Sequence, residues 1–239
     1  MRFGSLFAGI GGFDLGLERA GMECKWQVEI DDFCNRVLEK HWPHVKRYRD
    51  VREVGAHNLE PVDVICGGFP CQDISTCGPG GGLSGSRSGL WREFARILGE
   101  MGPRFAVVEN VANLNKRGLA NILGDLANLG YDAWWDKFHA SAFGSFSRRP
   151  RIFLVAFPTG FRFSPTWEIH RSRLETKIAY QEAVGLVNFI REEAMPYVCR
   201  RHDGVSPKLD ESAIKALGNA VVPQIVEIIG RAIMEADAL

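Results

Sequence analysis

The stretch FGSLFAGIGGFDLGLERAG, residues 3–21, decides the fold. Its short apolar start, Phe3 to Phe7, predicts a strand, and the helical spacing of apolar residues over Gly11 to Ala20 predicts a helix that Gly21 can end. Glycines between a strand and a helix let the backbone approach a ligand closely, with the helix amides facing that ligand. The turn is compatible with a nucleotide phosphate, with an adenosyl group, or with close packing alone.

The same alternation of strand and helix continues along the chain. Strands are predicted over 25–30, 62–66, 105–108 and 151–157, and helices over 31–40, 90–101, 119–129 and 223–236. Repeated units of this kind predict an α/β fold, a mostly parallel sheet with helices on both faces. Ligands of such sheets bind beyond the carboxyl ends of the strands, so the residues that follow each strand are the candidate site residues.

Composition bounds the class of protein. The chain has 239 residues, 46% of them hydrophobic and 24% charged, which excludes global disorder. Lys and Arg together number 29, as do Asp and Glu, so a polyanion would need a local basic patch. The absence of a leader and of an apolar run near ~20 residues predicts a cytoplasmic protein that binds no membrane. The six cysteines show neither CxxC nor paired histidine spacing, which predicts reduced thiols and no metal site.

Three segments differ in character. Residues 1–157 alternate regularly, residues 158–212 are irregular and predict a small second lobe, and residues 213–239 are regular again. Residues 75–89, STCGPGGGLSGSRSG, predict a mobile loop directly after a strand. Residues 145–177 carry seven Lys and Arg residues against two Glu residues, so the positive charge is concentrated there.

Three acidic residues lie at or just beyond strand ends. Glu29 comes about 20 residues after the glycines, where an acid can bind ribose hydroxyls, although an acid at a helix start is common too. Asp50 follows a possible third strand and is either a contact for an adenine amino group or a plain loop residue. Glu109 follows the strand 105–108, where it can approach a substrate, or it is a surface acid.

Cysteine and arginine complete the candidate site. Cys71 lies just beyond a strand end in VICGGFPCQ, residues 64–72, among glycines and a proline that direct the backbone. A thiol there is open to a substrate, and a basic neighbour would lower its pKa. Free cysteines are more often buried and inert, which fits Cys66 better. The arginines of SRRPR, residues 147–151, can grip phosphates, although one or two of them can simply be solvated.

Taken together, these motifs resemble the DNA (cytosine-5) methyltransferase family. FAGIGG, PCQ, ENV, the paired arginines and GNAVVPQ stand in the family's order over almost the whole chain. The resemblance implies a Rossmann-like, S-adenosyl-L-methionine-dependent methyltransferase fold. The chain departs from the family at Ser147, where Gln is usual, in the segment before GNAVVPQ, and in its short second lobe.

The resemblance assigns roles to individual residues. Those for catalysis are Cys71, Glu109, Arg149 and Arg151. Those for S-adenosyl-L-methionine are Phe7, Ala8, Gly9, Ile10, Gly11, Gly12, Glu29, Ile30, Asp50, Pro70, Asn219 and Ala220. Those for DNA are Gln72, Ser75, Arg87, Arg148 and Arg173. Residues 1–157 then form the catalytic and cofactor-binding domain, 158–212 the target-recognition lobe, and 213–239 a segment returning to the catalytic domain.

The implied activity is methyl transfer from S-adenosyl-L-methionine to carbon 5 of a flipped-out cytosine in double-stranded DNA, through a covalent Cys71 adduct. We expect a monomer, with a cognate restriction endonuclease as a possible companion. The runner-up is the same chemistry on transfer RNA. A nicotinamide dehydrogenase explains the glycines and Glu29 but not PCQ and ENV. A thiol hydrolase would need a histidine near Cys71, and a pure nucleic-acid-binding module needs neither Cys71 nor Glu109.

Overall fold

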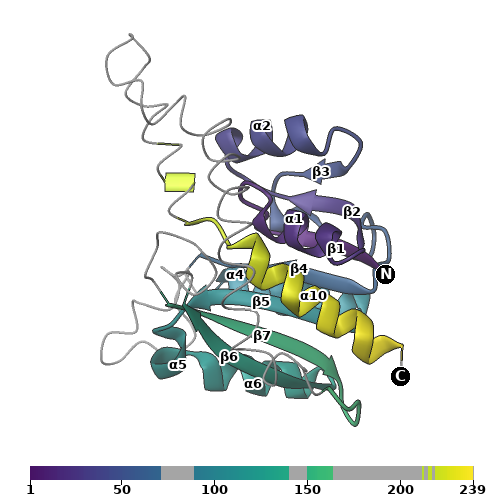
Figure 1. The fold of residues 1–239 in the computed structure, drawn as a ribbon, viewed down its shortest axis with the longest axis vertical. Helices are drawn as coiled ribbons and strands as arrows, with labels where there is room; N and C mark the ends of the chain where they lie inside the picture. The colour runs from purple at the N-terminus through teal and green to yellow at the C-terminus, as the bar shows by residue number, and fades with distance from the viewer. Residues whose placement is uncertain (71–88, 140–149, 164–211, 213–214, 217–218, 239) are drawn as a thin grey trace.

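The computed structural model describes residues 1–70, 89–139, 150–163, 212, 215–216 and 219–238. Their centre is a seven-stranded sheet of order β3-β2-β1-β4-β5-β7-β6 (Figure 1). The strands are β1 (Arg2–Leu6), β2 (Glu23–Val28), β3 (Lys46–Tyr48), β4 (Val64–Gly67), β5 (Phe105–Val111), β6 (Tyr131–His139) and β7 (Pro150–Pro158). Neighbours from β3 to β5 pair in parallel, whereas β7 runs antiparallel to both β5 and β6.

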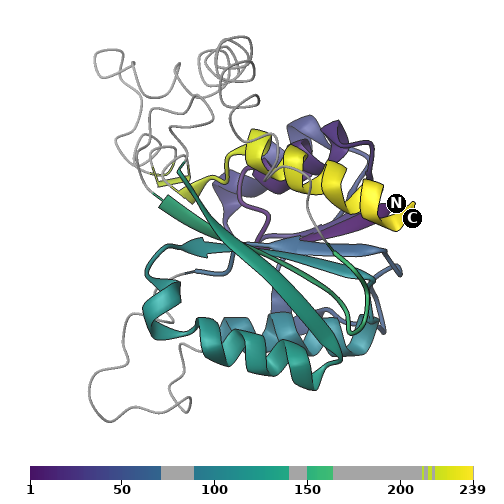
Figure 2. The same cartoon turned by 60° about the horizontal axis from the view of Figure 1, so that its bottom comes forward.

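Helices cover both faces of this sheet (Figure 2). One face carries α1 (Gly12–Arg19), α2 (Asp32–His41) and α10 (Pro223–Asp237). The other carries α4 (Gly89–Met101), α5 (Leu114–Arg117) and α6 (Leu119–Asn128), and a short 3-10 helix, η1 (Val51–Glu53), follows β3. The predicted α/β class with a mostly parallel, doubly covered sheet is confirmed.

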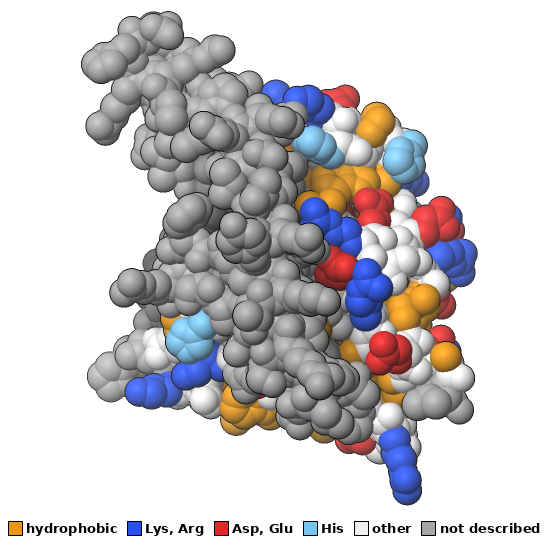
Figure 3. Space-filling model, in the orientation of Figure 1, with side chains coloured by type: hydrophobic (Ala, Val, Ile, Leu, Met, Phe, Trp, Pro, Cys, Tyr) orange, Lys and Arg blue, Asp and Glu red, His pale blue; other side chains and the backbone are white. Residues whose placement is uncertain are grey.

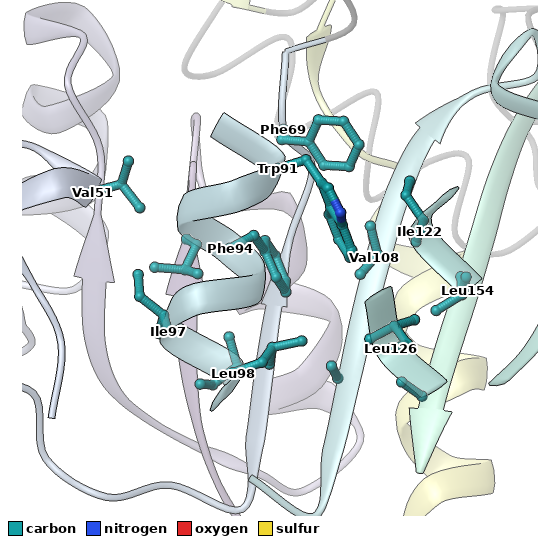
Figure 4. Packing of buried hydrophobic residues seen from close by; sticks show 14 of the residues in the cluster. Val51, Phe69, Trp91, Phe94, Ile97, Leu98, Val108, Ile122, Leu126 and Leu154 are labelled. Atoms are coloured by element: carbon teal, nitrogen blue, oxygen red, sulfur yellow. The ribbon is translucent and has the colours of Figure 1, made fainter. Parts of the chain in front are cut away.

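Each face has its own hydrophobic core. Phe13 of α1 and Ile229 of α10 belong to the first cluster. In the second, Trp91, Phe94 and Ile97 of α4 pack with residues of the sheet and of α6 (Figure 4). Apolar residues at helical spacing on α4 therefore face the sheet, because burying them removes apolar surface from water.

Small residues let α10 lie against α1. A Cβ on Gly16 would lie 2.5 Å from Cβ of Val226, and a Cβ on Gly230 would lie 2.7 Å from Cβ of Ala20. Both distances are shorter than real Cβ contacts, so these positions require glycine for the observed approach. This packing brings the end of the chain back beside its first helix.

Few residues of the predicted second lobe, 158–212, lie in the described part of the chain. Phe161 and Phe163 follow β7, and their rings lie 5.4 Å and 6.4 Å from that of Phe105. The lobe boundaries at 158 and 212 stay predictions, because residues 164–211 lie outside the described residues. None of the helices in the described ranges combines the length and apolar character required to cross a bilayer.

Candidate active site

Residues 7–12, which we call the glycine turn, follow β1 and have an unusual backbone conformation. Phe7, Gly9 and Gly11 have φ angles of 53°, 56° and 86°. Only glycine adopts such angles without cost, so Phe7 is strained by roughly 1–2 kcal/mol. The amide of Ala8 donates to the carbonyl of Val28, at 3.1 Å, which ties the turn to the end of β2. A Cβ on Gly9 would meet nothing within 4 Å, so the turn borders open space.

Glu29 joins this turn to the start of α2. Its Oε2 accepts a hydrogen bond of 2.7 Å from the amide of Gly9, and its Oε1 accepts one of 2.8 Å from the amide of Asp31. Asp31, not Glu29, caps α2, because its carboxylate accepts from the amide of Cys34 at 3.0 Å. The structure thus excludes Glu29 as the cap of α2 and shows a fixed, half-buried acid beside the glycine turn, whereas its role in ribose binding stays a prediction.

The neighbourhood of Glu29 has features that suit an adenosyl group. Ile30 is 63% exposed, an unusual exposure for a large apolar side chain at a strand end. The turn offers backbone amides, and each carboxylate oxygen of Glu29 keeps a lone pair for a ribose hydroxyl.

Asp50 caps η1 and pairs with Arg52 at 2.6 Å, and this hydrogen-bonded partner lowers the pKa of Asp50, which stays ionised.

Residues from the end of the chain reach the same turn. A Cβ on Gly12 would lie 2.5 Å from the carbonyl oxygen of Val221, so the segment before α10 touches the start of α1. Asn219, which is exposed, and Ala220, which is half-buried, directly precede Val221. The two predicted cofactor residues of this segment are therefore the neighbours in sequence of a residue that contacts the glycine turn.

Glu109 and Arg151 form an ion pair at the same edge of the sheet. The distance from Nε of Arg151 to Oε1 of Glu109 is 2.8 Å, and their side chains are 21% and 10% exposed. Because β7 is antiparallel to β5, its first residues lie beside the carboxyl ends of the parallel strands. Glu109 pairs with Phe153 across the ladder, and Arg151, two residues earlier, shares the face of Phe153. Glu109 itself lies within β5, which continues three residues beyond the predicted end of the strand.

Burial raises the pKa of Glu109 to about 7, and the guanidinium of Arg151 opposes that rise. A carboxyl group with such a pKa exists in both protonation states near neutral pH. It can therefore accept or donate a hydrogen bond to a heteroaromatic ring, which is the property that a general acid or base requires.

The segment that leads to Cys71 runs past Glu109. A Cβ on Gly68 would lie 2.7 Å from Oε2 of Glu109, so only glycine leaves room for this carboxylate. The side-chain amide of Asn110 donates to the carbonyl of Phe69 at 3.0 Å, and Asn110 is 2% exposed. Gly68 and Asn110 were not predicted as site residues; their only sequence signal is their place within GGFPCQ and ENV.

Several predicted site residues lie outside the described part of the chain. They are Cys71, Gln72, Ser75, Arg87, Arg148, Arg149 and Arg173. Pro70 is described and is exposed. The described part of the site therefore holds the glycine turn, the acid after β2, the ion pair on β5 and β7, and the approach to Cys71.

Comparisons with known proteins identify the family. The model of the C-5 cytosine-specific DNA methylase family matches residues 1–195. Type II methyltransferase M.HhaI of Haemophilus parahaemolyticus is 32% identical over 179 residues, 71% of this chain and 54% of that protein. Type II methyltransferase M2.BsuMI of Bacillus subtilis (strain 168) is 35% identical over 164 residues, 65% of this chain and 42% of that protein. The chain thus spans about half the length of these curated relatives.

Solved structures agree with this assignment. A putative DNA modification methyltransferase encoded within an Escherichia coli prophage superposes with a TM-score of 0.59 at 29% identity, covering 71% of this chain and 50% of that one. The Spodoptera frugiperda DNMT2 structure, at 13% identity and a TM-score of 0.67, covers 98% of this chain and 99% of that one, and shows the likeness of the fold alone. The fold, the ordered motifs and the family match lead to one conclusion: the chain belongs to the C-5 cytosine-specific DNA methylase family.

Proposed function

We propose that this protein transfers a methyl group from S-adenosyl-L-methionine to carbon 5 of cytosine in DNA. The observation that carries the proposal is the buried Glu109, held by Arg151 beside the segment that leads to Cys71. An acid with a pKa of about 7 at that edge suits the recognition of a base ring. The names of the relatives, Type II methyltransferases, support DNA as the substrate.

The residues around the glycine turn fit the cofactor. In this proposal the amides of residues 7–12 face it, Glu29 holds the ribose, and Ile30 packs against the adenine. Asn219 and Ala220 approach from the end of the chain. When bound, S-adenosyl-L-methionine supplies a methyl group on a sulfonium, which is an electrophile. Because Glu29 is already fixed by Gly9 and Asp31, little side-chain freedom is lost on binding.

The chemistry on the base needs a nucleophile and an acid. The thiolate of Cys71 adds to carbon 6 of cytosine, which breaks the aromaticity and makes carbon 5 nucleophilic. Glu109 holds ring nitrogen 3 and the exocyclic amine, so it stabilises the charge that develops there. Carbon 5 takes the methyl group. A base, for which water is sufficient, removes the carbon-5 proton, and the electron pair of that bond expels the Cys71 thiolate.

Access to the base requires that it leave the duplex, at a cost of roughly a few kcal/mol. We propose that residues 75–89 close over the flipped nucleotide, and that Arg149 and Arg151 hold it. Positive and negative side chains are interspersed over the described part of the face in Figure 3. The sequence concentrates positive charge between residues 145 and 177, so these basic residues are the proposed phosphate contacts, and they make DNA binding salt-sensitive. A cognate restriction endonuclease, which the Type II names of the relatives support, completes the proposal together with a monomeric state and a cytoplasmic location.

Methylation-resolved sequencing tests the proposal directly. DNA and transfer RNA are incubated separately with S-adenosyl-L-methionine and either the wild-type chain or Cys71→Ser. We expect 5-methylcytosine in a specific DNA sequence with the wild type and none with the variant. Product from Cys71→Ser, or no 5-methylcytosine in either nucleic acid, would contradict the proposal, and product in RNA alone would favour the transfer-RNA alternative. A 5-fluorocytosine substrate should trap a covalent complex through Cys71, because fluorine cannot leave as a proton does.

A further inference from the structure

A buried acid beneath the glycine turn has no part in the proposed chemistry. Asp14 lies in the first turn of α1 and is fully buried. Its Oδ1 accepts from Nε2 of Gln27 at 2.9 Å and from Sγ of Cys24 at 3.4 Å. Its Oδ2 accepts from the hydroxyl of Ser5 at 3.2 Å. One carboxylate on α1 thus gathers donors from β1 and from two positions on β2.

This cluster is costly to the folded state. Burial raises the pKa of Asp14 to about 6, because its three partners are uncharged and only partly replace water. Gln27 adds a second cost, since its Oε1 is buried without a hydrogen-bond partner. An apolar cluster at the same place would avoid both costs. Buried polar groups that weaken the fold are expected where function requires them.

The position of the cluster indicates what that function is. Ser5 and Asp14 stand at the two ends of the glycine turn, so the hydrogen bond between them closes the turn at its base. Gln27 lies on β2, two residues before Glu29, which follows that strand, and the carboxylate of Glu29 accepts from the amide of Gly9 in the same turn. Two carboxylates therefore hold the turn. Asp14 binds Ser5, which precedes the turn, and Glu29 binds Gly9 within it, and the strained Phe7 lies between Ser5 and Gly9 in the sequence.

In the structure all three partners of the Asp14 carboxylate act as donors. A carboxylate is an acceptor at both oxygens, whereas an asparagine would present an NH2 group to one of the donors. Replacement by Asn keeps the shape and removes the buried charge, but at least one of the three donors must then reorient or lose its acceptor.

We propose that Asp14 is a positioning residue for cofactor binding, which fixes the glycine turn between β1 and β2 in the conformation that receives the adenosyl group. It touches no substrate in this proposal and acts through the turn and Glu29. The inference rests on the proposed function for its ligand, S-adenosyl-L-methionine.

The test compares affinity with stability in the full chain. Binding of S-adenosylhomocysteine is measured by isothermal titration calorimetry, and unfolding by urea at pH 7.5, for the wild type and Asp14→Asn. We expect the dissociation constant of Asp14→Asn to rise at least tenfold, with a urea midpoint that is unchanged or higher. In methylation assays the KM for S-adenosyl-L-methionine should rise while kcat at saturation stays within about threefold.

Two further variants keep the inference falsifiable. Ser5→Ala removes only the bond that closes the turn and should weaken binding several-fold, so it decides the matter if Asp14→Asn does not fold. Asp125→Asn is the matched control on the opposite face of the sheet, where Asp125 accepts from Trp91 at 2.7 Å, and should bind as the wild type does. A wild type that binds no S-adenosylhomocysteine would refute the proposed function. A wild type that binds, with Asp14→Asn and Ser5→Ala binding equally well, would refute this inference alone.

Discussion

Replacing Glu109 by Gln should stabilise the protein at pH 8 and abolish the proposed methyl transfer. Burial raises the pKa of Glu109 from 4.5 to about 7, so the native state binds the proton more tightly than the unfolded state does. Stability from this group is therefore complete below pH 4.5 and is lost as the pH rises to 7. At 1.36 kcal/mol for each pH unit between the two pKa values, the loss is about 3 kcal/mol.

Gln cannot titrate, so the variant escapes this loss. The gain is reduced because Arg151 is left without its counter-charge, but its side chain is 21% exposed and water can solvate it in part. We therefore expect Glu109→Gln to be more stable than the wild type by about 1–3 kcal/mol at pH 8. The two proteins should differ much less at pH 4.5.

Urea unfolding at pH 4.5 and pH 8 measures this difference. Other groups, Asp14 among them, titrate in both proteins. The effect of Glu109 is therefore the change, between pH 4.5 and pH 8, in the difference in free energy of unfolding between the wild type and Glu109→Gln. Glu100→Gln is the control of opposite sign: Arg96 lowers the pKa of Glu100, so that variant should lose stability at pH 8 relative to the wild type. Parallel pH profiles for the wild type and Glu109→Gln would refute the assignment of a raised pKa to Glu109.

Three further substitutions probe the same edge of the sheet. Arg151→Met removes the cation that lowers the pKa of Glu109, so the pH–rate profile should move to higher pH and kcat should fall at least 100-fold; an unmoved profile would contradict the pairing. Gly68→Ala places a Cβ 2.7 Å from Oε2 of Glu109 and should lower kcat at least tenfold, with wild-type activity as the contrary result. Gly12→Ala places a Cβ 2.5 Å from the carbonyl of Val221, and should lower the free energy of unfolding by about 1–3 kcal/mol and weaken S-adenosylhomocysteine binding, which calorimetry measures.

Periodicity in the sequence was sufficient for most of the fold. The predicted helix 90–101 is observed as Gly89–Met101, and the predicted strand 151–157 as Pro150–Pro158. The edge strand Tyr131–His139 was missed, because YDAWWDKFH shows no regular alternation of apolar and polar residues. An edge strand pairs on one side only, so its sequence is less constrained than that of a buried strand. The antiparallel direction of β7 was also not predicted, since direction is set by pairing and not by residue type.

The site residues that follow the ends of parallel strands could be predicted from the sequence. The contacts that depend on the pairing register of β5 and β7 could not. The carboxyl ends of parallel strands bring Glu29 and the glycine turn to one edge, as the sequence predicts. The contact of Arg151 with Glu109 depends on β7 being antiparallel and on the pairing of Glu109 with Phe153. Asp14 gave no signal, because an acid in the first turn of a helix is ordinarily a surface residue that favours the helix dipole.

Asp14 and Glu109 are both buried acids with raised pKa values, yet their surroundings differ in a way that separates their roles. Glu109 has a cation beside it and stands at the sheet edge that the proposed function assigns to the base ring. Asp14 has only neutral donors and is enclosed between α1 and the sheet, so no substrate can reach it. Removing either charge should strengthen the fold, but through different losses of function: kcat for Glu109 and cofactor affinity for Asp14. A stabilised variant that keeps both kcat and cofactor affinity is therefore expected only from substitutions elsewhere in the chain.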